Sequence, residues 1–225
     1  MPLSLPTSIK SIVFDAYGTL FDVQTLDAFL KEHYGDKSQP INAIWRQKQL
    51  QYTWLRSLMG RYEPFSNVTT DALRYACQVQ GEVLSASLEQ QLVQRYYTLQ
   101  AFPDTLSSLG KLASSVQLAV LSNANPEMLE QAVHHNGLHP FLTHILSVDS
   151  IQMYKPIPAV YDLATQAFGL EKEEIVFVSS NTWDVAGAKS AGLRVIWLNR
   201  YNGNLEELGI EPDWQISSLE EIILT

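Results

Sequence analysis

The stretch Val13–Asp22 reads VFDAYGTLFD, and it decides the fold. A run of apolar residues ends on Asp15, and Gly18 and Thr19 follow in a tight turn. Because glycine allows backbone conformations that other residues rarely adopt, this pattern predicts a buried strand that stops abruptly at an acid. Such an acid could be a nucleophile, a metal ligand or the cap of a helix, and the rest of the chain has to decide among the three.

The composition is that of an acidic globular protein. The 225 residues carry a formal net charge of −9, and 46% of them are hydrophobic. This is ordinary for a soluble chain that forms one domain or two small ones. Nucleic-acid-binding proteins usually present a basic face, so we expect no nucleic-acid partner. An anionic substrate would need a local positive site against this overall charge.

No segment is expected to direct the chain to a membrane. The start, MPLSLPTSIK, lacks the basic residues and apolar run of a signal peptide, and no stretch reaches the roughly 18 apolar residues of a membrane span. We therefore expect a cytoplasmic protein with no membrane partner. The single cysteine, Cys77, excludes an internal disulfide and is expected to be a packed thiol.

Short segments rich in Val and Ile predict a parallel sheet. Buried strands are expected at residues 11–17, 117–123, 144–148, 174–180 and 194–199, with a sixth, edge strand at 213–217. Helical stretches of about a dozen residues separate the later strands, and this alternation implies helices on both faces of the sheet. The expected fold class is therefore α/β, with a three-layer core.

Residues 23–100 interrupt the alternation. They contain no convincing strand, and apolar residues recur in them at helical spacing. Helices are expected at 24–34, 41–59, 67–80 and 86–99. We predict a helical cap subdomain at 23–100, inserted into a core formed by residues 1–22 and 101–225. Such an insertion would lie above the carboxyl ends of the strands, where open α/β sheets bind ligands.

Polar residues gather where the predicted strands end. They are Asp15 after the first strand, Ser122 and Asn123 after the second, Lys155 after the third, and Ser179, Asn181 and Asp184 after the fourth. Taken singly, each could be a turn, cap or solvated residue. Because the carboxyl ends of parallel strands meet at one edge of a sheet, we expect these residues to lie together and form a site.

Four segments together resemble the motifs of the haloacid dehalogenase (HAD) superfamily. They are FDAYGTLFD (14–22), LSNANP (121–126), YKPIPAVY (154–161) and FVSSNTWD (177–184). The stretch IWRQKQLQYTWLRSLMGRYEPF (44–65) resembles the cap of the L-2-haloacid dehalogenases within it. The resemblance covers nearly the whole chain. It implies a HAD-like Rossmannoid core with a helical cap, and a hydrolase that acts on carbon–halide bonds.

The residue two places after Asp15 narrows the chemistry. Most members of the superfamily transfer phosphoryl groups with Mg²⁺ and carry a second Asp there as acid and base. Here the position holds Tyr17, which cannot protonate a leaving alkoxide at neutral pH. A halide leaves without a proton, so Tyr17 favours dehalogenation. The missing acid also leaves Mg²⁺ without its usual ligands, so we expect no metal and no other cofactor.

The resemblance implies a covalent route and a role for each residue. Ionised Asp15 would attack C2 of a small L-2-haloalkanoate and invert it, and water would hydrolyse the ester on Asp15 to release a D-2-hydroxy acid. The implied catalytic residues are Asp15, Thr19, Arg46, Lys155, Ser179, Asn181 and Asp184. The implied substrate-binding residues are Tyr17, Gln47, Leu50, Phe65, Ser122, Asn123, Tyr161 and Trp183.

Within this set, Arg46, Asn123 and Trp183 would receive the halide, and Lys155 would offset the charge of Asp15. A helix would place Arg46, Leu50 and Trp54 on one face, with the guanidinium beside apolar groups. The implied partners are the 2-haloalkanoate, the halide and, by the habit of the family, a second copy of the chain in a homodimer.

Two other functions stay open at this point. A Mg²⁺-dependent phosphatase of the same fold would need the missing second acid, and a non-catalytic protein that binds a small carboxylate would not need so complete a set of polar groups. The chain also departs from the family at Ala124, where Gly is common. If that turn required a positive φ, Ala124 would be strained and the preferred size of substrate would change.

Overall fold

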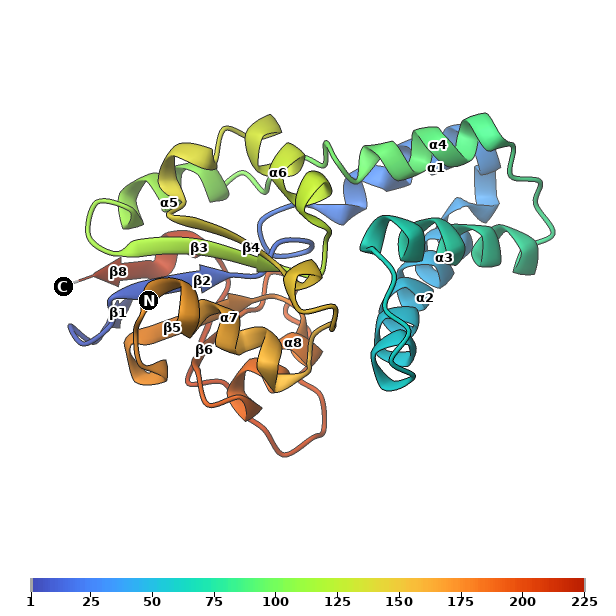
Figure 1. Ribbon diagram of the computed structural model, residues 1–225. Coiled ribbons are helices and arrows are strands. Elements are labelled where there is room, and N and C mark those ends of the chain that lie inside the picture. Colours follow the sequence, from blue (N-terminus) through green and yellow to red (C-terminus); the bar gives the residue numbers. More distant parts are fainter. Residues whose placement is uncertain (1, 225) are drawn as a thin grey trace.

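The computed structural model describes residues 2–224, and its core is a six-stranded sheet in which every neighbouring pair is parallel (Figure 1). Across the sheet the order is β4 (His144–Ser147), β3 (Gln117–Ser122), β2 (Ser11–Phe14), β5 (Ile175–Ser179), β6 (Arg194–Leu198) and β7 (Trp214–Ile216). Every residue of β2 and β5 is buried, which accounts for their nearly continuous apolar sequence. All six predicted strands are confirmed.

Asp15 follows the strand at which the chain reverses its direction across the sheet. From β2 the chain forms β3 and β4 on one side, and it then returns to form β5, β6 and β7 on the other side. Ligands of open α/β sheets bind at such a switch point, outside the carboxyl ends of the strands. The register pairs Phe14 with both Val120 and Val178, so residues that follow the three strands emerge side by side.

Helices cover both faces of the sheet. Figure 1 shows α5 (Thr105–Leu112) and α6 (Pro126–His135) on one face, with α7 (Pro158–Phe168) and α8 (Thr182–Ser190) on the other. The α/β fold class with three layers is therefore confirmed. Two further strands, β1 (Leu3–Leu5) and β8 (Ile222–Leu224), pair in a small separate sheet that sequence periodicity did not predict. Three residues are too few to show a period.

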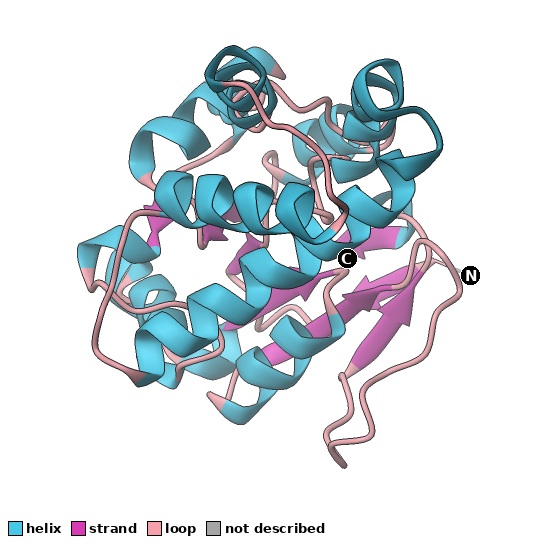
Figure 2. Cartoon of the chain, turned by 90° about the vertical axis from the view of Figure 1, so that its right-hand side faces the viewer, coloured by secondary structure: helices cyan, strands magenta, loops and turns pink. Residues whose placement is uncertain are grey.

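Between β2 and α5 the chain forms four α-helices. They are α1 (Leu26–Tyr34), α2 (Ser38–Leu58), α3 (Phe65–Val79) and α4 (Ala86–Arg95). The view in Figure 2 places the helical insertion, residues 23–100, in front of the sheet. The fourth helix ends at Arg95 and not near residue 99, because residues 96–101 lead back to the core. No helix within residues 2–224 combines the length and the hydropathy of a membrane span, and the cytoplasmic location stays a prediction.

The two ends of the helical insertion leave and rejoin the core side by side. The Asp22 N–H donates to the Gln100 carbonyl at 2.8 Å, and the Phe102 N–H donates to the Leu20 carbonyl at 2.9 Å. The side chain of Asn136, at the end of α6, braces the returning segment with hydrogen bonds to its backbone. The two chain segments that connect the insertion to the core therefore run side by side and are hydrogen-bonded to each other.

Candidate active site

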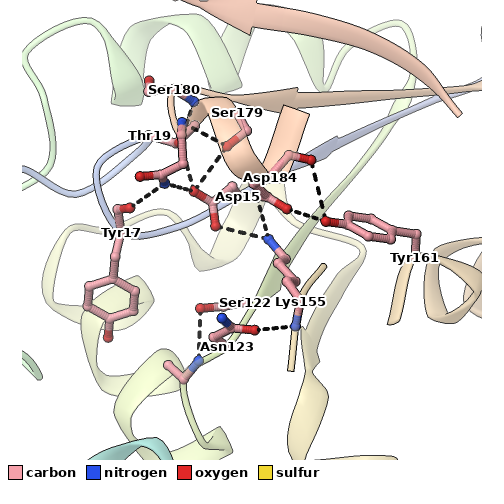
Figure 3. A network of polar contacts seen from close by, with 12 residues as sticks. Asp15, Tyr17, Thr19, Ser122, Asn123, Lys155, Tyr161, Ser179, Ser180 and Asp184 are labelled. Carbon is pink, nitrogen blue, oxygen red and sulfur yellow. Dashed lines mark hydrogen bonds and ion pairs between the residues drawn. The ribbon is translucent and has the colours of Figure 1, made fainter. Parts of the chain in front are cut away.

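The carboxylate of Asp15 is the centre of a buried polar network (Figure 3). Its Oδ2 accepts hydrogen bonds from Asn181 Nδ2 at 2.7 Å, Thr19 Oγ1 at 2.9 Å and Ser179 Oγ at 3.4 Å. Its Oδ1 accepts one bond, from Lys155 Nζ at 3.0 Å. The two oxygens therefore differ: three donors hold Oδ2, whereas Oδ1 keeps lone pairs for another partner.

The ammonium group of Lys155 lies between two carboxylates. Its Nζ is 3.0 Å from Asp15 Oδ1 and 2.9 Å from Asp184 Oδ2, and its side chain is 1% exposed. A charge this deeply buried is stable only when it is paired and hydrogen-bonded. Burial lowers the pKa of Lys155, but the two carboxylates outweigh burial and hold that pKa above its ordinary value. Lys155 therefore stays charged.

Asp184 is held by Lys155 and by Tyr161. The Tyr161 hydroxyl donates to Asp184 Oδ1 at 2.7 Å, and both side chains are fully buried. Burial raises the pKa of Asp184 to about 6, against the opposing effects of Lys155 and Tyr161. A carboxylate with such a pKa can take up a proton near neutral pH. Tyr161 was expected near the substrate, and it acts on Asp184 instead.

The turn after β2 is fixed by its own backbone and by two neighbours. Gly18 has a φ of +89°, which confirms that this turn needs a glycine. Thr19 Oγ1 accepts from the Ser180 N–H at 2.9 Å, and the Thr19 carbonyl accepts from Arg200 Nη2 at 3.0 Å. Arg200 follows the end of β6. A search for polar residues after each predicted strand, which identified the other site residues, would also have identified Arg200.

The Tyr17 hydroxyl is turned away from Asp15. It donates to the Tyr96 carbonyl at 3.2 Å, in the segment that ends the helical insertion. Burial raises the pKa of Tyr17 well above its usual range. The side chain is therefore neutral and engaged elsewhere, and it cannot act as an acid beside Asp15.

A small cavity of about 20 Å³ lies over Asp15. Asp15, Ser122, Asn123, Ala124 and Asn181 line it from the core side, together with Tyr17, Arg46, Leu50, Phe65 and Trp183. Arg46 and Leu50 lie one turn apart on α2, as predicted from their spacing. The cavity thus combines a carboxylate, a guanidinium and an apolar wall.

The loop after β3 adopts an unstrained conformation. Ser122 Oγ accepts from the Ala124 N–H at 3.1 Å, and Asn123 Oδ1 accepts from the Lys155 N–H at 3.0 Å. Within residues 2–224 the non-glycine residues with positive φ are Gln152 and Asn202, so the condition under which Ala124 would be strained is not met. The turn does not require a left-handed residue.

The expected role of Gln47 is not supported, and a different glutamine proves important. Gln47 is exposed and does not line the cavity. Neighbouring positions on a helix point about 100° apart, so of these two residues it is Arg46 that faces the cavity. Gln49 is fully buried, donates to Thr69 Oγ1 at 2.9 Å and accepts from the Tyr96 hydroxyl at 3.0 Å. The helical spacing is the signal that separates the two glutamines, because Gln49 follows the buried Ile41 and Trp45 at intervals of four on α2.

No group of three or more His, Cys, Asp or Glu side chains within residues 2–224 could hold a metal ion. Asp15 and Asp184 do lie together, but each gives an oxygen to the Lys155 ammonium between them. The arrangement is instead suited to a nucleophilic carboxylate whose charge is balanced by a fixed cation.

A parallel sheet with helices inserted after its first strand, and an acid there bridged by a lysine to a second acid, define a haloacid dehalogenase-like hydrolase. The chain belongs to that family, whose profile matches residues 9–192.

Named relatives lie within the dehalogenases of this family. An (S)-2-haloacid dehalogenase from Pseudomonas sp. (strain YL) is 45% identical over 216 residues, which cover 96% of this chain and 93% of the relative. Haloacetate dehalogenase H-2 from Moraxella sp. (strain B) is 41% identical over 96% of both chains. The L-2-haloacid dehalogenase from Xanthobacter autotrophicus with chloropropionic acid covalently bound matches with a TM-score of 0.90 at 35% identity, over 95% of this chain and 96% of that chain.

Gly187 on α8 allows Tyr161 to reach Asp184, and replacing it is expected to destabilise the fold. A Cβ at this position would collide with the Tyr161 hydroxyl and with Pro156. Gly187→Ala should lower the free energy of unfolding by about 1–3 kcal/mol, measured by urea denaturation. Gly203→Ala is the control: its Cβ would meet nothing closer than 3.9 Å, and we expect a change within about 0.5 kcal/mol. Equal stability of the two variants would contradict the close approach.

Proposed function

We propose that the protein is an (S)-2-haloacid dehalogenase that hydrolyses small L-2-haloalkanoic acids to D-2-hydroxy acids with inversion. The observation that carries the proposal is the asymmetry of the Asp15 carboxylate, with three donors on Oδ2 and Lys155 alone on Oδ1. Relatives that carry this name, and the Xanthobacter autotrophicus structure with chloropropionic acid covalently bound, support it.

In the first step Asp15 Oδ1 attacks C2 of the haloacid. A bond forms between Oδ1 and C2 while the carbon–halogen bond breaks, and the halide leaves with its electron pair from the opposite side. Arg46, Asn123 and Trp183 receive the halide, since all three line the cavity over Asp15. No proton is needed, which agrees with the engaged Tyr17 hydroxyl.

In the second step water attacks Cγ of the ester on Asp15. Negative charge then develops on Oδ2, where Thr19, Ser179 and Asn181 already donate hydrogen bonds. Donors placed in advance around a developing oxyanion lower the barrier of such a step. Asp184 takes one proton of the water and passes it to the hydroxy acid oxygen as the bond from Cγ to that oxygen breaks. The second proton of the water is lost from the new carboxyl group to solvent, so Asp15 is regenerated as a carboxylate.

The other groups bind the acid in this scheme. Ser122 faces its carboxylate, and Tyr17, Leu50 and Phe65 form the wall around its alkyl group. The helical insertion supplies Arg46, Leu50 and Phe65 to the cavity, so residues 23–100 act as a cap that completes the site.

Halide release from the two enantiomers of 2-chloropropionate tests the proposal. The L enantiomer should release chloride in the presence of EDTA, the D enantiomer should not, and Asp15→Asn should reduce the rate at least about 10⁴-fold because the nucleophile is lost. In H₂¹⁸O a single turnover should leave ¹⁸O in the Asp15 peptide and not in the hydroxy acid. Label in the hydroxy acid alone would show direct attack by water and refute the ester route.

The pH dependence of the reaction tests the role of Asp184. Its carboxylate must be ionised to take up a proton, so kcat should fall as the pH drops through about 6, the pKa to which burial raises this group. Tyr161→Phe removes a hydrogen bond that lowers the pKa of Asp184, so the acid limb should move up by about one pH unit. Tyr201→Phe, at an exposed tyrosine, should leave the profile unchanged. An unmoved acid limb in Tyr161→Phe would exclude Asp184 as the titrating group.

We further infer a homodimer that meets on the outer face of α2 and α3. Leu55, Met59, Tyr75 and Val79 are exposed there, and clustered exposed apolar side chains commonly mark an interface. Leu55→Glu combined with Met59→Glu should convert the parent dimer to a monomer in size-exclusion chromatography with light scattering. Leu106→Glu, at an exposed leucine on α5, is the control. A parent protein that is monomeric at every concentration would disprove the dimer.

A further inference from the structure

An apolar groove of about 540 Å³ lies next to the active-site cavity. Its apolar lining comes from three parts of the chain. Trp54 and Leu58 belong to α2, Ile157 precedes α7, and Leu208 and Ile210 belong to the segment after β6. Its other lining residues include Lys155 and Trp183, and Trp183 also lines the cavity over Asp15. The groove and the cavity therefore share a wall.

Trp183, the residue common to groove and cavity, packs against Trp54. Trp54 comes from the helical insertion and Trp183 from α8, and their rings meet edge to face at 5.9 Å between centroids and 71° between planes. Both indole nitrogens are buried, and neither has a hydrogen-bond partner within residues 2–224. Ring packing alone holds this pair together.

A second contact between the helical insertion and the core involves Tyr154, another lining residue of the groove. Tyr62 donates to Asp149 Oδ1 at 2.7 Å, and the Tyr154 hydroxyl donates to the Glu63 carbonyl at 2.5 Å. The rings of Tyr62 and Tyr154 also pack at 5.0 Å, and Phe65 packs against Tyr154. Because hydrogen bonds reinforce the ring contacts here, this part of the groove wall is harder to open than the Trp54–Trp183 contact.

The cavity over Asp15 has to enlarge before it can hold the substrate. A cavity of about 20 Å³ has room for about one water molecule and not for a haloalkanoic acid. We propose that the apolar groove is the access route for the 2-haloalkanoate, that the Trp54–Trp183 pair is its gate, and that Trp54 limits the length of the alkyl chain admitted. The proposal rests on the proposed function. The apolar lining suits the alkyl chain and the halogen, and the groove leads to Lys155 beside the nucleophile.

Two substitutions that act in opposite directions test the gate. The measured quantity is the ratio of kcat/KM for L-2-bromohexanoate to kcat/KM for L-2-bromopropionate, which share a leaving group and differ in chain length. Trp54→Ala should raise this ratio about tenfold by opening the gate, the scale on which a few methylene groups are discriminated. Leu58→Trp should lower it at least about threefold by filling the groove. Trp54→Phe keeps a ring at the gate and should retain the parent ratio.

Val83→Trp is the matched control. Val83 is 85% exposed against 83% for Leu58, it belongs to the same helical insertion, and it does not line the groove. Its ratio should equal that of the parent. Loss of stability alone would lower both rate constants together and leave the ratio unmoved, and if Trp54→Ala does not fold, Leu58→Trp still decides. Unchanged ratios in folded Trp54→Ala and Leu58→Trp would contradict the proposed gate. A parent protein that releases no bromide from L-2-bromopropionate would contradict the proposed function itself.

Discussion

The site depends on one buried cation. The Lys155 ammonium lies between Asp15 and Asp184, two carboxylates that would otherwise repel each other in a region closed to water. The three residues follow β4, β2 and β5, so the ion pairs also tie together the carboxyl ends of separate strands. Asn123 adds the loop after β3 through its bond to the Lys155 N–H. The parallel sheet and its ion pairs therefore fix the position of the Asp15 carboxylate together.

The sheet and most of the polar site can be predicted from the sequence, because both depend on local patterns. Each apolar run marks a strand, and parallel topology then brings together whatever polar residues follow the strands, such as Asp15, Lys155 and Asp184. The sequence prediction missed Gln49, although it follows Ile41 and Trp45 at intervals of four on α2, because polar side chains on a helix are more often solvated than buried. The contact of Tyr161 with Asp184 was equally hidden, because it depends on the absence of a side chain at Gly187.

Tyr17 connects the chemistry of the core to the helices above it. Its carbonyl accepts from Asn181 and its hydroxyl donates to the Tyr96 carbonyl, so one residue links the strand end that carries the nucleophile to the end of the insertion. Tyr96 in turn bonds to Gln49 on the helix that carries Arg46. Tyr17 therefore joins the core to the helical insertion through hydrogen bonds on both sides.

The paired connection at Leu20–Asp22 and Gln100–Phe102 has a consequence for how such a protein diversifies. The 78 residues of 23–100 leave the core and return to it at neighbouring points, as a long loop would. Chain segments of that kind can be lengthened, shortened or exchanged without disturbing the domain that bears them. Selection can then alter the side chains that the inserted helices contribute to the cavity, while the strand ends keep Asp15 and Lys155.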